Sequence, residues 1–526
     1  MAATGCGKDA HRTSVRERGR GEKVDRTTID AEPTPATTTF MPAVEAGDWA
    51  TALQVLDEHW VEIWFAVDPA DLRRVVAAAP PDALAALPNA GYLARTAGHG
   101  LVEDLLEPEP PPRRAASPAE LARYIADLRL RGRPALAMTQ VRRAAERVRA
   151  QRGRPVDGSG GAIALWLVQA ALTALLAGEV TTAKGLLLGA LDTHRPDRFP
   201  FVVREATAKL ALAHAMSGDV TEALQVNERA RALSRTQSWV ERMVDDTISL
   251  TDYICAVDML DPRAEDLRRA GASPLAHGEF WPVALEAHVR HLTLTGRSRQ
   301  ADELCDAAAA AGLPPAGADG VIATAVSDAR VVARADLCGL PAPPEDARGA
   351  TAQVALARAL HLFTAGRYPE VTRLELPATF DDRLHRAHAL LRAQATVAEG
   401  RVEEGRRLLL HTLREVLDRG TWSTLRYLTR ETLGALADSP EGARAVELVE
   451  RHGLATVEVR AELAAPLSDA EVEVLQLLRE GLTREEIAQR LFLSVNTVKT
   501  QLRSAYRKLG VSRRPEALEM LARLGL

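Results

Sequence analysis

The chain has 526 residues, which is too long for one hydrophobic core and implies roughly three to four domain-sized units. Its composition, 46% hydrophobic and 26% charged, is globular, and its net charge of −5 argues against a body that coats nucleic acid. The four cysteines are scattered, which argues against a disulfide framework or a zinc site. No run of 18 apolar residues and no N-terminal signal core occurs, so we expect a cytoplasmic protein without a membrane segment.

Residues 1–40 are polar and end in EPTPATTT, so we expect this segment to be disordered. Seven bases and six acids nearly balance, which gives little support to a basic arm that grips DNA. The segment holds the nearest match to a phosphate-binding loop, Gly5 to Lys8, but Asp9 follows the lysine and no strand precedes it. Met41 is an alternative start for the folded protein.

Two breaks divide the next part of the chain, at Pro108 to Pro112 and at Gly153 to Gly161. They predict an N-terminal helical subdomain at 41–107, followed by a long helical body at 117–460. This body is rich in Ala and Leu and has almost no strand signals, so the predicted fold class is all-α.

Tight turns of a shared form recur along these helical parts: AGDWATAL at 46–53, AGEVTTAK at 177–184, SGDVTEAL at 217–224, TGRSRQAD at 295–302, AGRYPEV at 365–371 and EGRVEEG at 399–405. Their glycines lie 40 residues apart at 178 and 218, and 34 apart at 366 and 400. That period predicts a tetratricopeptide-like solenoid of helical hairpins. Further turns are expected at Asp261-Pro262, at Gly339 to Pro344 and at Ser439-Pro440.

Motifs for catalysis are missing: the sequence has no HExxH, GxSxG, GxGxxG or complete phosphate-binding loop. We therefore expect no enzyme activity and no cofactor. Two histidine pairs share helix faces, His288 with His291 and His385 with His388, and Asp381 lies one turn before the second pair. A metal site is one interpretation of each pair, but core or inter-helix hydrogen bonding is the favoured one.

Residues 461–466 are the expected linker to a compact C-terminal unit at 467–526. Its helix starts are marked by the capping boxes Ser468/Glu471 and Thr483/Glu486 and by the N-cap residue Ser494. Gly481 and Gly510 mark helix ends, and Ser512 with Pro515 opens a fourth helix to about Arg523. The short Phe492-Leu493 connection predicts helix-turn-helix geometry, with Leu493 plugging the crossing. The apolar positions predict one small core: Val474, Leu475, Leu478, Ile487, Ala488, Leu491, Val498, Leu502, Ala505 and Leu509.

The third helix of this unit differs from the first two in its charge. Residues 467–486 contain six acids and two bases, whereas residues 496–514 contain six bases and no acid. A duplex is a dense line of phosphates, and cations that neutralise them release counterions. An ordinary solvated helix is the alternative, but caps, turn length and one-sided charge together favour a groove-binding helix.

The stretches GLTREEIAQRLFLSVNTVKT and YRKLGVSRRPEA resemble the DNA-binding domain of the LuxR (NarL/FixJ-type) transcription regulators. The resemblance covers about 60 residues and implies that the helix at 496–509 enters the major groove. It implies that Lys499, Thr500 and Arg503 face base edges. It further implies that phosphates are held by Ser494, Asn496, Thr497, Arg507 and Lys508. Gln501 stands where the family usually has His, and its amide can still donate to a phosphate.

The body resembles, more loosely, the helical region of the large MalT-like regulators, without their ATPase module. The sequence thus predicts a sequence-specific transcription regulator that binds double-stranded DNA. The resemblance to the LuxR family implies a homodimer on DNA, with the fourth helix as the contact between the two copies. The body would sense a small-molecule or protein inducer or mediate oligomerisation, with RNA polymerase a further candidate partner. The alternative is an interaction scaffold whose C-terminal unit does not bind DNA by itself.

Overall fold

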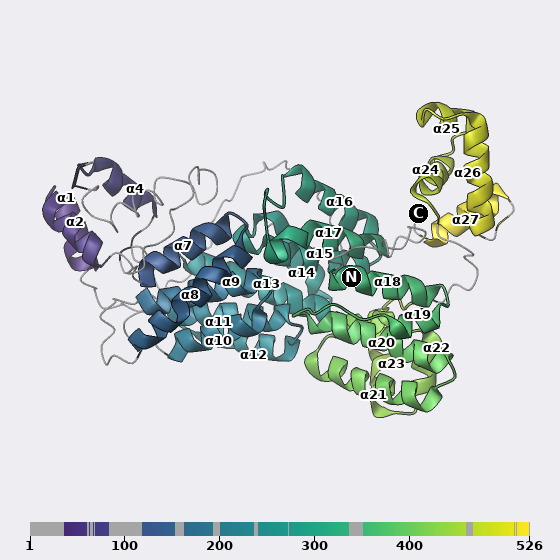
Figure 1. The fold of residues 1–526 in the computed structure, drawn as a ribbon, viewed down its shortest axis with the longest axis horizontal. Helices are drawn as coiled ribbons and strands as arrows, with labels where there is room; N and C mark the ends of the chain where they lie inside the picture. The colour runs from purple at the N-terminus through teal and green to yellow at the C-terminus, as the bar shows by residue number, and fades with distance from the viewer. Residues whose placement is uncertain are drawn as a thin grey trace, which may run out of the picture. The chain divides into compact units, whose positions relative to one another are not determined.

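The computed structural model describes residues 36–59, 63, 67, 69–80, 82–83, 118–152, 162–192, 200–235, 240–271, 273–335, 351–458, 467–509, 511 and 513–524. Within these ranges the regular structure is entirely helical, so the all-α prediction is confirmed (Figure 1). No helix in the same ranges is long and apolar enough to cross a membrane. Several expected features lie outside the described residues: the segment 1–35 with Gly5 to Lys8, both predicted breaks, the turn at Gly339 to Pro344, the linker 461–466, Gly510 and Ser512.

The N-terminal helices form a small cluster with its own core. It contains a π-helical turn, Ala36–Phe40, and the helices α1 (Met41–Glu45), α2 (Trp49–Glu58) and α4 (Pro69–Ala78). The turn belongs to the segment expected to be disordered, but Phe40 is fully buried together with Leu56 and Leu72. The burial of this aromatic ring accounts for the order of the turn, because a Phe side chain buries a large apolar area.

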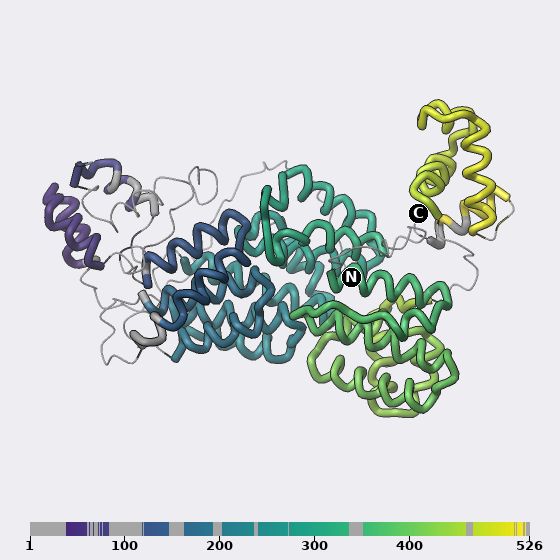
Figure 2. The backbone as a smooth tube through the Cα atoms, viewed as in Figure 1, coloured from purple at the N-terminus to yellow at the C-terminus, as the bar shows by residue number. Residues whose placement is uncertain are grey.

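The body consists of successive helices that pack against their neighbours as antiparallel hairpins (Figure 2). Its first part contains α7 (Pro118–Leu130), α8 (Pro134–Arg152), α9 (Ala162–Leu176), α10 (Val180–Asp192), α11 (Pro200–Met216), α12 (Val220–Ala232), α13 (Glu241–Asp258), α14 (Arg263–Ala270), α15 (Trp281–Leu294), α16 (Ser298–Ala310) and α17 (Gly320–Ala335). Its second part contains α18 (Ala352–Thr364), α19 (Tyr368–Arg373), α20 (Asp382–Ala398), α21 (Val402–Arg419), the 3-10 helix η4 (Trp422–Tyr427), α22 (Arg430–Leu436) and α23 (Pro440–His452).

Each predicted glycine turn joins two helices, and its glycine has a positive φ: 72° at Gly47, 83° at Gly178, 75° at Gly218, 72° at Gly296, 71° at Gly366 and 88° at Gly400. A residue without Cβ adopts this left-handed conformation at no steric cost. The turn at Asp261-Pro262 is also present, with Leu260 taking the left-handed position at φ 56°. The classification of these hairpins as tetratricopeptide-like remains a prediction.

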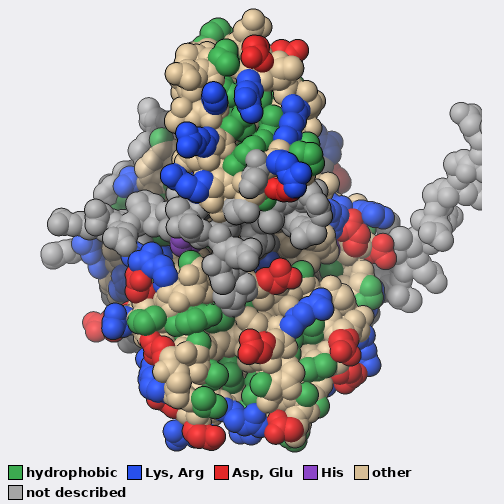
Figure 3. Space-filling model, turned by 90° about the vertical axis from the view of Figure 1, so that its right-hand side faces the viewer, with side chains coloured by type: hydrophobic (Ala, Val, Ile, Leu, Met, Phe, Trp, Pro, Cys, Tyr) green, Lys and Arg blue, Asp and Glu red, His purple; other side chains and the backbone are tan. Residues whose placement is uncertain are grey.

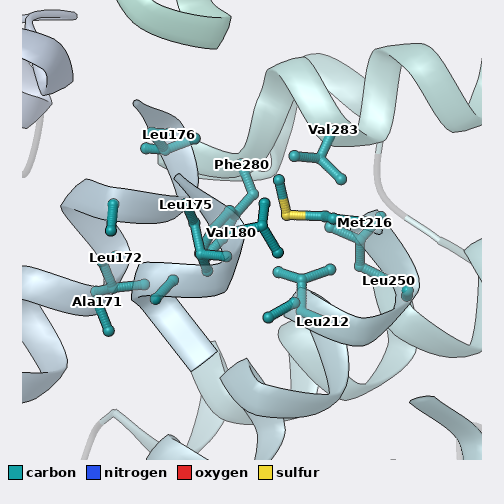
Figure 4. Close-up of a cluster of buried hydrophobic side chains, with 14 of the residues drawn as sticks. Ala171, Leu172, Leu175, Leu176, Val180, Leu212, Met216, Leu250, Phe280 and Val283 are labelled. Atoms are coloured by element: carbon teal, nitrogen blue, oxygen red, sulfur yellow. The ribbon is translucent and has the colours of Figure 1, made fainter. Parts of the chain in front are cut away.

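Small residues after the turns allow the paired helices to approach closely, because Ala183, Ala223 and Ala301 are all fully buried. One continuous core runs through the first part of the body, from Leu121 to Ala333. Figure 4 shows Leu175 of α9, Leu212 of α11 and Val283 of α15 converging in this core. Separate clusters lie in the second part, one around Leu356 and Leu391 and one around Leu413 and Leu448.

A buried ionic network joins the two parts of the body. Arg383 of α20 donates to Asp258 Oδ2 of α13 at 2.7 Å and to the carbonyls of Ala215 and Met216, each at 2.9 Å. Asp381 caps α20 and accepts from Arg383 Nε at 2.8 Å, so its carboxylate serves the helix start and this network. Asp258 is fully buried, so its negative charge needs the guanidinium group of Arg383 as a partner.

The C-terminal domain contains α24 (Asp469–Arg479), α25 (Arg484–Arg490), α26 (Val495–Lys508) and α27 (Arg514–Leu524). These helices enclose a separate core, and every predicted core residue belongs to it or packs against it. The predicted role of Leu493 is wrong, because its side chain is 37% exposed and does not plug the helix crossing. Ile487 and Val498 fill the contact between α25 and α26 instead.

Candidate nucleic-acid interface

The three predicted N-caps of the C-terminal domain are formed. Ser468 and Thr483 each make a complete capping box, in which the hydroxyl accepts an N3 amide and the N3 glutamate accepts the cap amide. Ser494 caps α26 by accepting from the Thr497 amide at 3.0 Å. These caps satisfy amides that a helix start leaves without intrahelical partners, and they fix where each helix begins.

One face of α26 is buried and the opposite face is exposed. Val498, Leu502 and Ala505 point into the domain core. On the exposed side, the spacing of three and four residues places these side chains on one stripe: Asn496, Lys499, Thr500, Arg503 and Arg507. The structure therefore brings five of the predicted site residues together on one surface.

The cations of this stripe have no acidic neighbours to neutralise them. Lys499, Arg503 and Arg507 are exposed, and none of them has an ion-pair partner among the residues that the structure describes. Figure 3 shows Lys and Arg side chains gathered across one face of the C-terminal domain. Such a face offers positive charge to a polyanion without the cost of breaking existing ion pairs.

Lys508 lies in a different environment from its neighbour Arg507. Its Nζ atom is 2.7 Å from Glu471 Oε2 of α24, and its side chain is 19% exposed. Although burial opposes the shift, the Lys508 ammonium and the Ser468 amide hold the pKa of Glu471 down to about 2. The ammonium of Lys508 therefore ties α26 to α24, and a phosphate would compete with Glu471 for it.

The remaining predicted residues lie around the stripe. Ser494 and Thr497 are exposed at the start of α26, where their hydroxyls lie 2.8 Å apart. The Thr500 hydroxyl donates to the Asn496 carbonyl at 2.9 Å. Gln501 is only partly exposed, and its Oε1 is buried and accepts no hydrogen bond from any described residue.

Sequence reasoning missed a feature of the turn between α25 and α26. Phe492 has φ 55° although it is not glycine, and its side chain is 96% exposed. The amides of Phe492 and Leu493 donate to the carbonyls of Gln489 and Ala488, which is the hydrogen-bond pattern of a Schellman motif. The sequence did contain a sign of this feature. The turn has no glycine, so a residue with a side chain must adopt the left-handed conformation.

Neither histidine pair forms a metal site in the structure. Both members of the first pair are buried beside Tyr253, and His291 Nε2 lies 3.3 Å from Glu265. In the second pair His385 is exposed and His388 is buried. Among the described residues no group of three or more His, Cys, Asp or Glu side chains could hold a metal ion.

Residues 465–521 match the sequence model of a family described as "Bacterial regulatory proteins, luxR family". Over 60 residues the chain is 40% identical to the HTH-type transcriptional regulator MalT of Yersinia pestis (strain Pestoides F), and equally to that of Yersinia pseudotuberculosis serotype O:1b (strain IP 31758). Each match covers 11% of this chain and 7% of the relative, so the chain spans only a small part of these curated relatives. No solved structure matches the chain.

The family match covers the helices of the C-terminal domain. The matched residues include all four C-terminal helices up to Leu521 of α27. The C-terminal domain is thus a LuxR-family helix-turn-helix domain, as its motifs predicted. The match does not extend to the body, whose resemblance to the MalT-like helical region stays a prediction.

Proposed function

We propose that the chain is a transcription regulator that binds a specific double-stranded DNA site through α26. The observation that carries this proposal is the set of three exposed cations in the stripe, Lys499, Arg503 and Arg507, on the helix that follows the helix-turn-helix turn. In such motifs the second helix enters the major groove and its N-terminal side chains contact base edges. The printed names of the relatives, HTH-type transcriptional regulators, support the same function.

We assign the predicted site residues to two roles, base contact and phosphate contact, according to their position along α26. Lys499, Thr500 and Arg503 occupy its N-terminal half and middle, and we assign them to base edges. Ser494, Asn496 and Thr497 surround the helix start, where amides and hydroxyls are suited to a phosphate. Arg507 continues the exposed side and takes a further phosphate, whereas Lys508 acts mainly through Glu471.

Two regions complete the proposed regulator. The fourth helix α27 is the proposed contact between two copies on a palindromic site, a geometry common among helix-turn-helix dimers. The helical body is the proposed sensor or oligomerisation region. The competing candidate, a scaffold whose C-terminal domain does not bind DNA, is supported only by the large share of the chain in the helical body.

The test is a pull-down of genomic DNA fragments with the full chain. It is repeated with Lys499→Ala and Arg503→Ala combined, and with a control of equal charge loss on the body, Arg299→Ala with Arg407→Ala. Discrete fragments enriched by the wild type and the control, but not by the stripe variant, are the expected result. Equal enrichment by both double variants would refute recognition through α26.

If the wild-type chain enriches no fragment, the residues 460–526 are tested alone. Binding by this fragment would indicate that the body restrains the domain until an inducer is present. A folded fragment that binds no DNA would refute the regulator and leave the scaffold.

A further inference from the structure

A cavity lies where α15, α17, α18, α20 and η4 meet in the body. It is partly open to solvent, and the space of about 750 Å³ between its lining atoms includes that open part. One wall is apolar and comes from two helices, α17 with Val332 and Ala335 and α18 with Leu356, Ala357 and Leu360. A concave apolar wall facing a few polar groups is the usual form of a small-molecule site.

The remaining lining includes polar groups that belong to the buried ionic network. Arg383, Asp381 and Ser423 line it, but the structure already occupies their hydrogen-bonding atoms. Arg383 donates to Asp258, Asp381 and two backbone carbonyls, and the Ser423 hydroxyl donates to Asp258 at 3.0 Å. These groups hold the fold together and have little capacity left for a ligand.

Arg290 differs from these neighbours because it has a donor to spare. Its Nη1 donates to Glu286 at 2.5 Å, and its Nε lies 3.4 Å from Asp258 Oδ1. Its Nη2 is buried and donates to no acceptor among the described residues. A buried donor without a partner is unfavourable, and a ligand oxygen in the cavity would relieve that cost.

The charges around the cavity are already balanced. Arg290, Arg383 and Arg426 line it together with two carboxylates, Glu286 and Asp381. The third carboxylate is Asp258, which does not line the cavity but is fully buried against Arg290 and Arg383. A ligand with a net charge would leave that charge uncompensated in a largely buried place, which is unfavourable. The balance therefore favours an uncharged ligand that presents an oxygen acceptor to Arg290.

We propose that this cavity binds a neutral amphipathic small molecule whose carbonyl or hydroxyl oxygen accepts from Arg290 Nη2 and whose apolar part packs against α17 and α18. The site spans the two parts of the body, because Arg290 and Val332 belong to the first and Leu356 and Ala387 to the second. An occupant would hold these parts together. The role of this cavity as the inducer site rests on the proposed regulator function, whereas the binding of a small molecule in the cavity does not.

The test uses the neutral naphthyl ketone Prodan, whose fluorescence responds to an apolar environment and to hydrogen bonding at its carbonyl. The full chain is titrated in the absence of DNA, so a failure of DNA binding leaves the result unaffected. Ala357→Trp fills the cavity, and Ala309→Trp places the same side chain on the exposed surface of α16 as the matched control. Arg290→Lys keeps a cation beside Glu286 but removes the spare donor.

We expect saturable, blue-shifted binding of one probe per chain to the wild type and to Ala309→Trp. Ala357→Trp should weaken it at least tenfold, and Arg290→Lys about fivefold, the value of one hydrogen bond. Thermal unfolding of each variant identifies any variant that fails to fold. If Ala357→Trp fails to fold, the comparison of Arg290→Lys with the wild type remains as the test. Absence of saturable binding, or equal affinity in all folded variants, would overturn the site. Equally tight binding of the anionic anilinonaphthalene sulfonate at the same place would overturn the neutral class of ligand.

Discussion

Arg507 and Lys508 are adjacent cations in α26, and the structure predicts different effects when each is replaced by alanine. Arg507 is exposed and has no ion-pair partner among the described residues, so its charge is available to a phosphate. Lys508 is already held 2.7 Å from Glu471 Oε2. Both substitutions remove one positive charge, and the two variants therefore control for each other.

The magnitude follows from counterion release. Each phosphate neutralised on duplex DNA contributes about 0.9 to the slope of log affinity against log salt concentration. Arg507→Ala should lower the steepness of this slope by about 0.9 per half-site. That corresponds to about a threefold to fourfold smaller loss of affinity per half-site when salt rises from about 50 to about 200 mM. Lys508→Ala should leave the slope nearly unchanged and instead lower the stability of the C-terminal domain.

The assay is a fluorescence-anisotropy titration of a fragment recovered in the pull-down, repeated over a range of salt concentrations. Chemical denaturation of the two variants, followed by hydrogen exchange of α24 and α26, reports the stability of the domain. A slope that falls equally in both variants would contradict the reasoning. It would mean that DNA displaces Glu471 from Lys508 and that the ion pair does not reserve this lysine for the fold.

Three further predictions concern stability. Glu471→Gln should destabilise the C-terminal domain by about 2 kcal/mol, measured by hydrogen exchange of α24. Because the pKa of Glu471 is lowered from its ordinary value of 4.5 to about 2, this contribution is complete above about pH 4.5. It is lost as the pH falls toward 2, so a wild-type domain equally stable at pH 3 and pH 7 would refute it. Arg383→Met should destabilise the body by about 3–5 kcal/mol, because Asp258 loses a partner while fully buried, and a small change in thermal unfolding would contradict this. Phe492→Gly should leave the domain unchanged or stabilise it by about 0.5–1 kcal/mol in chemical denaturation, since a left-handed backbone costs an L-residue roughly 1–2 kcal/mol and the ring is exposed. A loss of stability would show that the ring packs on the domain.

The local features of the C-terminal domain were predictable from sequence because their causes are local. A capping box joins residues three apart, as in Ser468 and Glu471, so the pattern and the contact are nearly the same information. The same holds for the glycine turns, where the need for a positive φ at Gly178 or Gly218 is visible in the residue itself. Leu493 was misjudged because its neighbour Phe492 takes the left-handed conformation, which turns the chain and leaves Leu493 at the surface.

The buried network and the cavity could not be predicted, because their contacts join residues far apart in the chain. Arg383 and Asp258 are 125 positions apart, and Ser423 is 165 positions from Asp258. Periodicity assigned α13 and α20 to helices but gave no information on which charged residue would face which. Asp381 illustrates this, since its position one turn before His385 left a metal ligand as one interpretation and could not show that its carboxylate accepts from Arg383.

The surface of the body and the exposed side of α26 differ more clearly in how their cations are paired than in how many cations they carry. Arginines of the body repeatedly lie against carboxylates of a neighbouring helix, as Arg334 does with Asp302 at 3.0 Å and Arg414 with Glu441 at 2.6 Å. Such pairs hold side chains in place but leave little net charge for a partner. In α26 the acids are absent, so Lys499 and Arg503 keep their full charge at the surface. Since no ion pair among the described residues involves Lys499 or Arg503, their charge is available to a partner, and DNA is the polyanion that the geometry of this motif fits.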